Sequence, residues 1–257
     1  MTPQSDDVSY NPVPWLHVSH IRFLVEKYRE EDRPAAERIL EKANVALAEV
    51  KAQRKDASSG KTLKGIDLEE IAILSAIKSP DLLERLHTTA KKIKEHTYGN
   101  RIVTFAPLYF SNFCKNECTY CAFRASNLEL ERTELTQKQI ADQTRILVRQ
   151  GHKRVLMVAG EAYPGTDGLQ YVLDTMKTIY SVKDGKGEIR RVNANIAPLS
   201  VEDFKRLREA GVGTYQCFQE TYDPIAYKEF HKKGSKADYV WRANVFDRAT
   251  EAGIGDF

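Results

Sequence analysis

The sequence predicts an α/β fold in which strand–loop–helix units repeat after a helical N-terminal segment. Two observations support this prediction. At residue 101 the pattern changes from helically spaced apolar residues to β-rich stretches that alternate with helices. The repeats are roughly 30 to 45 residues long, which is typical of successive βα units in a parallel sheet or barrel. We therefore expect a helical extension over residues 1–100 and part of a barrel over residues 101–257.

The first hundred residues carry the start and stop signals of helices. Apolar residues recur at helical spacing over residues 21–29, and a polar break follows at residues 51–65. Ser79-Pro80-Asp81 is a typical helix start, and Gly99 a typical stop. Another helix should start at Asp32-Arg33-Pro34 and share one apolar side, made of Ile39, Leu40, Val45 and Leu47.

After residue 100 we expect four strands, at residues 101–109, 154–159, 190–196 and 213–219. The intervening helices begin at the capping box Thr136-Gln137-Lys138-Gln139, near Leu169, at Ser200 and near Asp238, the last running to about Ala252. Residues 253–257 resemble the start of a fifth strand. A parallel arc of four strands leaves an unpaired edge, so we expect a barrel truncated after about four βα units.

Composition and charge exclude several classes of protein. A chain of 257 residues with 42% hydrophobic residues can form a large core, so a globular protein is expected. The net charge of +3 is too small to indicate a nucleic-acid or membrane partner. The N-terminal stretch MTPQSDDVSYNPVPW lacks the features of a signal peptide, so we expect a cytoplasmic protein. Four cysteines are too few for a disulfide scaffold.

The stretch CKNECTYC holds three of the four cysteines, Cys114, Cys118 and Cys121. Structural zinc sites normally recruit four ligands in two short-spaced pairs, and the sequence has no second CxxC or HxxxH pair. A [4Fe-4S] cube accepts three thiolates and leaves its fourth iron open to an external ligand. The CxxxCxxC spacing therefore favours a cluster, with zinc or an incidental group of thiols as the alternative. Cys217 is expected to be a small core residue.

These residues resemble the radical S-adenosylmethionine (SAM) enzymes, whose signature is CxxxCxxC with an aromatic residue at the Tyr120 position. Longer stretches resemble the tyrosine lyase branch of that superfamily. They are YGNR (98–101), APLYFSN (106–112), CTYCAFRASN (118–127), GHKR (151–154), GEIRRVN (187–193), GTYQxFQETY (213–222) and DRA (247–249). The branch comprises HydG, the maturase of the [FeFe]-hydrogenase H-cluster, and ThiH, the 2-iminoacetate synthase of thiazole biosynthesis. The match is nearer to HydG, although Ala197-Pro198-Leu199 and Trp241-Arg242 are closer to ThiH.

The resemblance implies two cofactors, a [4Fe-4S] cluster and SAM. In the superfamily the three cysteines hold the cluster, whose open iron chelates SAM, and one electron cleaves SAM to methionine and a 5′-deoxyadenosyl radical. The SAM-binding candidates are Gly160 and Glu161 for the methionine amino group, Glu220 for the ribose, Arg242 for the carboxylate, and Tyr120. The alternatives are an ordinary βα turn for Gly160-Glu161, a surface glutamate for Glu220 and a solvated helical arginine for Arg242.

The resemblance also implies a substrate and partners. The tyrosine lyases cleave L-tyrosine between Cα and Cβ to a p-cresol precursor and dehydroglycine, with an electron donor such as ferredoxin or flavodoxin. HydG additionally works with other hydrogenase maturases. Tyr109 and Ser111 are candidates to line the substrate pocket, and a packing role is the equal alternative for Tyr109. We expect the second half of the barrel and an auxiliary-cluster domain to lie outside this chain, which leaves open whether the chain is active alone.

Two other classes of function remain open at this stage. A non-catalytic zinc-binding interaction module would use the same cysteines without iron or sulfide. A different radical SAM activity, such as that of biotin-synthase-like or HydE-like enzymes, would keep the cluster and leave tyrosine untouched. No nucleic-acid or membrane partner is expected in any of these cases.

Overall fold

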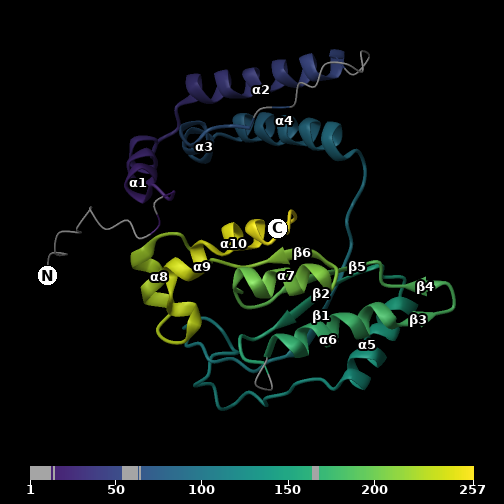
Figure 1. Ribbon diagram of the computed structural model, residues 1–257. Coiled ribbons are helices and arrows are strands. Elements are labelled where there is room, and N and C mark those ends of the chain that lie inside the picture. Colours follow the sequence, from purple (N-terminus) through teal and green to yellow (C-terminus); the bar gives the residue numbers. More distant parts are fainter. Residues whose placement is uncertain (1–12, 14, 54–62, 64, 164–167) are drawn as a thin grey trace, which may run out of the picture. The chain divides into compact units, whose positions relative to one another are not determined.

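The computed structural model describes residue 13, residues 15–53, residue 63, and residues 65–163 and 168–257. It divides the chain into two compact units, Met1–Ile102 and Val103–Phe257 (Figure 1). Most of the N-terminal stretch 1–15 and most of the polar break at 51–65 lie outside the described residues. The α/β prediction with a helical N-terminal segment is confirmed.

The first unit contains the helices α1 (Val18–Lys27), α2 (Arg33–Gln53), α3 (Leu68–Ser75) and α4 (Pro80–Tyr98). Helix α2 packs along α4, and a small apolar cluster holds α2, α3 and α4 together. The start of α2 is as expected, because Asp32 Oδ1 accepts a hydrogen bond from Ala35 N at 3.0 Å. Pro80 opens α4, and Gly99 ends it with a φ of 62°, in the left-handed region.

Two expectations for this unit were wrong or incomplete. Val45 is exposed, whereas Leu40 and Leu47 are buried. At 3.6 residues per turn, Val45 lies roughly 140° around the helix from Leu40, so it faces away from their common side. Helix α3 was not predicted, although its start carries a complete capping box between Asp67 and Glu70.

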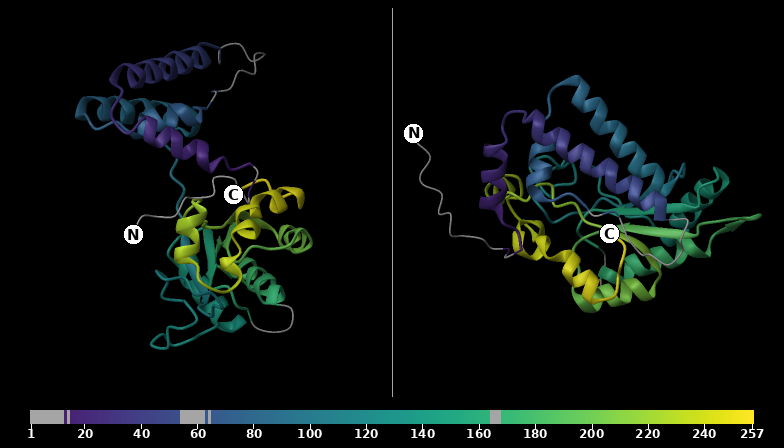
Figure 2. Two further views of the ribbon diagram at one scale, coloured as in Figure 1. Left: turned by 90° about the vertical axis from the view of Figure 1, so that its left-hand side faces the viewer. Right: turned by 90° about the horizontal axis from the view of Figure 1, so that it is seen from above.

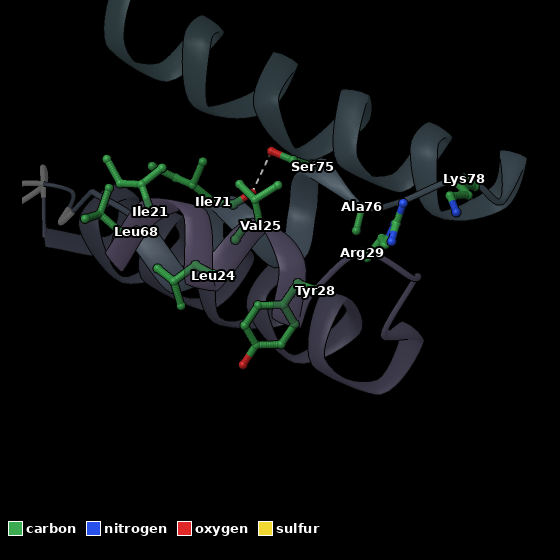
Figure 3. Close-up of a pocket in the computed structure, with 11 residues that line it drawn as sticks. Ile21, Leu24, Val25, Tyr28, Arg29, Leu68, Ile71, Ser75, Ala76 and Lys78 are labelled. Carbon is green, nitrogen blue, oxygen red and sulfur yellow. Dashed lines mark hydrogen bonds between the residues drawn. The ribbon is translucent and has the colours of Figure 1, made fainter. Parts of the chain in front are cut away.

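Helices α1 and α3 border an apolar cavity of about 350 Å³ (Figure 3). Ser75, on its wall, donates its hydroxyl to the Ile71 carbonyl at 2.7 Å and so satisfies its own polar group within the helix. None of the residues around the cavity is a cysteine, histidine or carboxylate, so the cavity offers no side chains typical of a metal site. They are Ile21, Leu24, Val25, Tyr28, Arg29, Leu68, Ile71, Ala72, Ser75, Ala76 and Lys78.

The second unit is built on a four-stranded parallel sheet with the order β1-β2-β5-β6. Its strands are β1 (Ala106–Ser111), β2 (Arg154–Ala159), β5 (Arg191–Asn195) and β6 (Val212–Gln216). The crossovers contain α5 (Gln137–Arg149), α6 (Gly168–Ser181) and α7 (Val201–Glu209), and a short antiparallel hairpin pairs β3 (Lys183–Asp184) with β4 (Gly187–Glu188). Sequential parallel pairing places the carboxyl ends of all four strands at one edge of the sheet.

One face of the sheet forms the core of this unit with the crossover helices α5, α6 and α7, which gather on the same side of it (Figure 2). Because side chains alternate along a strand, the residues between the core positions lie on the opposite face. That second face includes Tyr109, Asn193, Asn195 and Gln216, so it is more polar than the core face. The core positions on the strands are Leu108, Phe110, Val155, Met157, Val192, Ala194 and Tyr215.

Several boundaries differ from the expected ones. β1 starts at Ala106 and not at residue 101, and residues 101–105 are exposed without a strand partner in the described structure. The expected helix over 238–252 is two helices, α9 (Tyr239–Ala243) and α10 (Val245–Glu251), because Asn244 adopts φ −91° and ψ 19° between them. Helix α8 (Pro224–Phe230), capped by Asp223, was not predicted.

The expected fifth strand at residues 253–257 is present only as a contact. Tyr215 N in β6 donates a hydrogen bond to the Asp256 carbonyl at 3.0 Å, and Ile254 is buried in the core cluster. No strand is formed at residues 254–257. This segment therefore lies beside the free edge of β6 and covers part of it.

Candidate functional site

The cysteine loop follows β1 directly, at the carboxyl edge of the sheet. Cys114, Cys118 and Cys121 are all free thiols, with Cys118 buried and the other two partly exposed. Ligand sites in open parallel sheets form at this edge, where the loops after successive strands meet. Glu161, in the loop after β2, and Glu220, in the loop after β6, belong to the same edge.

A second segment, residues 230–236, pairs with the middle of the cysteine loop. Glu117 N donates to Lys233 O at 3.0 Å, Lys232 N donates to Glu117 O at 3.0 Å, and Thr119 N donates to Phe230 O at 2.9 Å. These bonds form a short antiparallel ladder that includes an isolated bridge between Cys118 and His231. The ladder fixes the backbone on both sides of Cys118.

Arg132 holds the two ends of the loop together. Its guanidinium donates to four backbone carbonyls, at distances of 2.7 to 3.3 Å. A guanidinium has five N–H donors in a planar fork, which suits this kind of multiple contact. The carbonyls belong to Asn112, Phe123, Arg124 and Asn127.

Gly160 follows β2 and lies against the start of the cysteine loop. Its N–H donates to the Ser111 carbonyl at 3.0 Å. A Cβ at this position would lie 2.2 Å from Phe113 O and 3.2 Å from Cys114 Cβ. Only glycine fits this close approach of two backbones. The residue before it is Ala159, where the family motif has a first glycine.

Glu161 and Arg242 form a buried ion pair beside the loop. Arg242 Nη1 lies 2.7 Å from Glu161 Oε1, and Arg242 Nε donates to Phe218 O at 2.9 Å. Burial disfavours the guanidinium, but the negative charge of Glu161 and neighbouring groups outweighs it, and the pKa of Arg242 is raised above its ordinary value. The alternative of a solvated helical arginine is therefore wrong.

Asn116, between the first two cysteines, connects this ion pair to segment 230–236. It is almost fully buried. Its Nδ2 donates to Glu161 Oε2 at 2.8 Å, and its Oδ1 accepts from Lys236 N at 2.9 Å. Gly234, with a φ of 87°, lets the segment pass close to Asn116, because a Cβ there would be 2.3 Å from Oδ1.

Tyr120 is bound to a buried histidine. Its hydroxyl lies 2.9 Å from His231 Nε2, and His231 Nδ1 lies 2.9 Å from the Tyr227 carbonyl. Because a carbonyl only accepts, Nδ1 carries the proton and Nε2 accepts from the tyrosine. Burial lowers the pKa of His231, in agreement with a neutral ring. The ring packs against Tyr120 edge to face, with centroids 5.6 Å apart.

Glu220 has the unusual backbone of the site. Among the described residues it is the one non-glycine residue with a positive φ, at 70°. Such strain persists where the surroundings hold it and is typical of functional sites. Its Oε1 lies 3.0 Å from Lys236 Nζ, and the residue is exposed. Since β6 ends at Gln216, Glu220 lies in the following loop and not at the strand end where it was expected.

The two candidate substrate residues differ in exposure. Tyr109 is exposed and packs edge to face on Phe123, with ring centroids 6.3 Å apart. Tyr109 therefore packs on a neighbouring ring at an exposed position, and its place in a substrate pocket stays a prediction. Ser111 is buried, and its Oγ accepts a hydrogen bond from Phe113 N at 3.3 Å, so it supports the start of the cysteine loop.

The donor set of the loop fits an iron–sulfur cube. Among the described residues, no group of three His, Cys, Asp or Glu side chains is gathered to hold a single metal ion. A cube needs no such convergence, because each thiolate binds a different iron. Phe123 N donates to Cys121 Sγ at 3.4 Å. Cys217 lies just after β6, packs against the sheet core, and has a pKa raised by burial.

Four residues that build this site were not assigned to it from the sequence: Asn116, Arg132, Lys236 and His231, the last of which was expected to be a structural or surface residue. Asn116 lies inside the cysteine motif, but the CxxxCxxC spacing alone does not indicate that a residue between the cysteines is a buried amide. His231 and Lys236 follow an unpredicted helix, α8, and reach the loop through pairing with a segment distant in sequence. The Gly234 that permits this approach was the one available signal.

The fold and the cysteine loop define a radical SAM protein, and a family comparison agrees. The Radical SAM superfamily model matches residues 108–256, more than half of the chain, so the chain belongs to this superfamily. In the part of the chain that the structure describes, no helix has the length and apolar character needed to cross a membrane.

Relatives place the similarity within the superfamily. A crystal structure of HydG, a maturase of the [FeFe]-hydrogenase, superposes with a TM-score of 0.83 at 42% identity, over 94% of this chain and 49% of that chain. HydG from Carboxydothermus hydrogenoformans superposes with a TM-score of 0.70 at 35% identity, over 96% and 52%. The 2-iminoacetate synthase of Salmonella typhimurium is 32% identical over 70% of this chain and 47% of its own length. This chain thus spans about half the length of these relatives.

Proposed function

We propose that the chain is the cofactor-binding part of a radical SAM tyrosine lyase of the HydG type. In this proposal it takes part in cleaving L-tyrosine between Cα and Cβ to p-cresol and dehydroglycine, during maturation of the [FeFe]-hydrogenase H-cluster. One observation carries the proposal: the cysteine loop is tied through Asn116 to the buried Glu161–Arg242 pair. The 42% identity to a HydG structure supports the choice of branch.

Cys114, Cys118 and Cys121 would bind three irons of a [4Fe-4S] cluster and leave the fourth iron for SAM. Their loop is held at its start by Gly160 and in its middle by segment 230–236, so the thiols need no large rearrangement to serve as ligands. Bound cluster and SAM would supply the radical chemistry, with electrons from a ferredoxin or flavodoxin.

SAM would be bound by groups that the structure gathers around the loop. Arg242 Nη2 donates to no residue of the described part of the chain, and it could hold a carboxylate, while Nε and Nη1 fix the guanidinium plane. Glu161 has both oxygens engaged, by Arg242 and by Asn116, so its carboxylate would orient Arg242 and leave cofactor contacts to the backbone at Gly160-Glu161. The exposed Glu220 carboxylate could accept from a ribose diol, and Tyr120 would border the cluster.

Tyr109 would border the substrate. It is exposed at the end of β1, next to the cysteine loop, and an aromatic ring there offers a face to the phenol ring of tyrosine. Ser111 would act indirectly, because its buried hydroxyl supports Phe113 N. Water exclusion and positioning are the contributions expected of the protein in such chemistry.

Anaerobic reconstitution with iron, sulfide, SAM, reductant and tyrosine tests the proposal. We expect close to four irons and four sulfides per chain, a change in the cluster's electron paramagnetic resonance (EPR) spectrum on adding SAM, and formation of deoxyadenosine. Formation of p-cresol would show that this chain is active alone. A loaded cluster whose EPR spectrum does not change when SAM is added would overturn the proposal. Bound zinc without sulfide would favour an interaction module.

Cysteine variants sharpen this test because the chain offers an internal control. Cys114→Ala, Cys118→Ala and Cys121→Ala should each lose most of the bound iron, since each removes one thiolate ligand. Cys217→Ala should keep it, because Cys217 packs against the sheet core. Equal iron loss in all four variants would contradict the assignment.

A 2-iminoacetate synthase of the ThiH type is the second candidate. It is favoured by the 32% identity to the Salmonella typhimurium 2-iminoacetate synthase. The two candidates share the tyrosine cleavage and differ in the fate of dehydroglycine. In the first case the whole protein would convert dehydroglycine to carbon monoxide and cyanide. In the second case it would release dehydroglycine for thiazole formation.

A further inference from the structure

Lys236 is a buried lysine whose backbone is fixed next to the cysteine loop. It lies in the short 3₁₀ helix Ser235–Ala237, directly after the close approach of Gly234 to Asn116. Its N–H donates to Asn116 Oδ1 at 2.9 Å, and its carbonyl accepts from the Tyr227 hydroxyl. Both backbone groups are therefore engaged, and the side chain starts from a defined position.

The Lys236 ammonium group points back to the loop. Nζ lies 3.0 Å from Glu220 Oε1 and 5.6 Å from the centroid of the Tyr120 ring, which sits between Cys118 and Cys121. The Lys236 side chain is 10% exposed and that of Glu220 is 37% exposed. Burying an ammonium is costly unless negative charge compensates it. Because Glu220 is more exposed, water screens its charge more than that of Lys236.

Two contacts place Lys236 beside the proposed cluster ligands. Its N–H bonds Asn116, which lies between Cys114 and Cys118, and its ammonium faces the ring of Tyr120, which lies between Cys118 and Cys121. The charge therefore lies next to the loop that the proposed function assigns to the cluster. Other charged groups around Lys236 are Glu220 and, behind Asn116, the Glu161–Arg242 pair, whose charges offset each other.

We propose that Lys236 is a positioning residue that raises the reduction potential of the cluster bound by Cys114, Cys118 and Cys121. The inference rests on the proposed function, because it requires the cluster. Reduction adds one negative charge to the cluster, and a fixed positive charge in a poorly screened position stabilises the reduced form. Glu220, as the partner of Lys236, weakens this effect and should therefore act with the opposite sign.

The test is an EPR-monitored redox titration of the reconstituted full chain, without SAM. Lys236→Met should shift the reduction equilibrium about tenfold toward the oxidised cluster, which is about 59 mV for a one-electron couple. Lys236→Arg should restore the wild-type potential, because it returns a positive charge to the same place. Glu220→Gln should shift the potential upward. Lys233→Met is the matched control, since Lys233 is an exposed lysine of the same segment, and should leave the potential unchanged.

The outcomes separate this inference from the proposed function. A Lys236→Met potential equal to wild type, or equal to that of Lys233→Met, would overturn the inference. If Lys236→Met takes up no cluster, the Glu220→Gln variant decides. The inference requires the reduction potential of that variant to rise, so a potential that falls or stays constant would contradict it. Wild-type chain without iron and sulfide would instead contradict the proposed function, and this is read from metal analysis before any titration.

Discussion

Two arginine–carboxylate pairs, one in each unit, have nearly the same geometry and opposite surroundings. In the helical unit, Arg33 Nη2 lies 2.7 Å from Asp81 Oδ1, with side chains 42% and 61% exposed. In the sheet unit, Arg242 Nη1 lies 2.7 Å from Glu161 Oε1, with side chains 4% and 11% exposed. Contact distance therefore does not distinguish the two pairs, and burial does.

The difference in burial implies a difference in role. The Arg33–Asp81 pair exchanges contacts with water at little cost and joins the start of α2 to the start of α4. The Arg242–Glu161 pair has lost its hydration, and apolar residues of equal size could stabilise the fold as well. Stability alone therefore does not explain the buried pair, whereas the proposed role of Arg242 in binding SAM would explain it.

Replacing Arg242 should have the largest effect on stability and therefore tests the comparison of the two pairs most strongly. Arg242→Met removes the cation that pairs with the buried Glu161 carboxylate. Of the side-chain contacts shorter than 3 Å, the one with Asn116 then remains. Breaking a buried pair from one side costs about 3 to 5 kcal/mol. The measurement is urea unfolding of the apo chain followed by Trp241 fluorescence, in a Trp15→Phe background so that the signal comes from the sheet unit.

The double variant Glu161→Gln with Arg242→Met is the control for that prediction. It removes both charges, so it should be less destabilised than the single Arg242→Met variant. A single variant that loses less than about 1 kcal/mol would show that the buried pair behaves like the exposed one, and the comparison would fail.

Gly160 tests whether the loop is held by close backbone contact. Gly160→Ala places a Cβ 2.2 Å from Phe113 O, so one of the two backbones must move. Forcing an extra methyl group into a packed site costs about 1 to 3 kcal/mol. We expect that loss in urea unfolding, and less iron per chain after reconstitution.

Gly255 is the matched control for this substitution. A Cβ there would meet nothing within 4 Å. Gly255→Ala should therefore change stability by less than about 0.5 kcal/mol and leave iron uptake intact. If both variants load iron equally, the contact at Gly160 is not what positions Cys114.

Local signals in the sequence predicted local structure well. Thr136 and Gln139 form the expected capping box of α5, and Ser200 caps α7 through Asp203 N. β2 covers the residues expected for it. In the two caps the decisive contacts lie within three or four residues, so the residue types alone determine them. The cysteine spacing belongs to the same class, because one loop carries all three thiols.

Contacts between distant segments were beyond sequence reasoning. His231 and Lys236 reach the cysteine loop only because segment 230–236 pairs with residues 117–119, and no periodicity encodes that pairing. Residues 101–105 have β-rich composition but remain exposed before β1, since strand propensity needs a paired neighbour to take effect. The residues that connect the site, Asn116 and Lys236, were therefore not predicted, whereas its three thiols and the members of its buried ion pair were named as candidates.

The smallest effect is expected at the exposed pair. Hydrogen bonds from Arg33 lower the pKa of Asp81 from 3.8 to about 2. A carboxyl group with a lowered pKa adds stability above its ordinary pKa, and this contribution is lost as the pH falls through the lowered value. The helical unit should therefore lose some stability from about pH 4 to about pH 2, and Asp81→Asn should lessen that loss, because its amide does not titrate.

The measurement is thermal unfolding followed by Trp15 fluorescence in a Trp241→Phe background, at several pH values and at low and high salt. At neutral pH, Asp81→Asn should shift the midpoint much less than Arg242→Met shifts that of the sheet unit, because water and salt screen the exposed pair. If Asp81→Asn shifts the midpoint at neutral pH as much as Arg242→Met does, exposure does not determine how much these pairs contribute to stability.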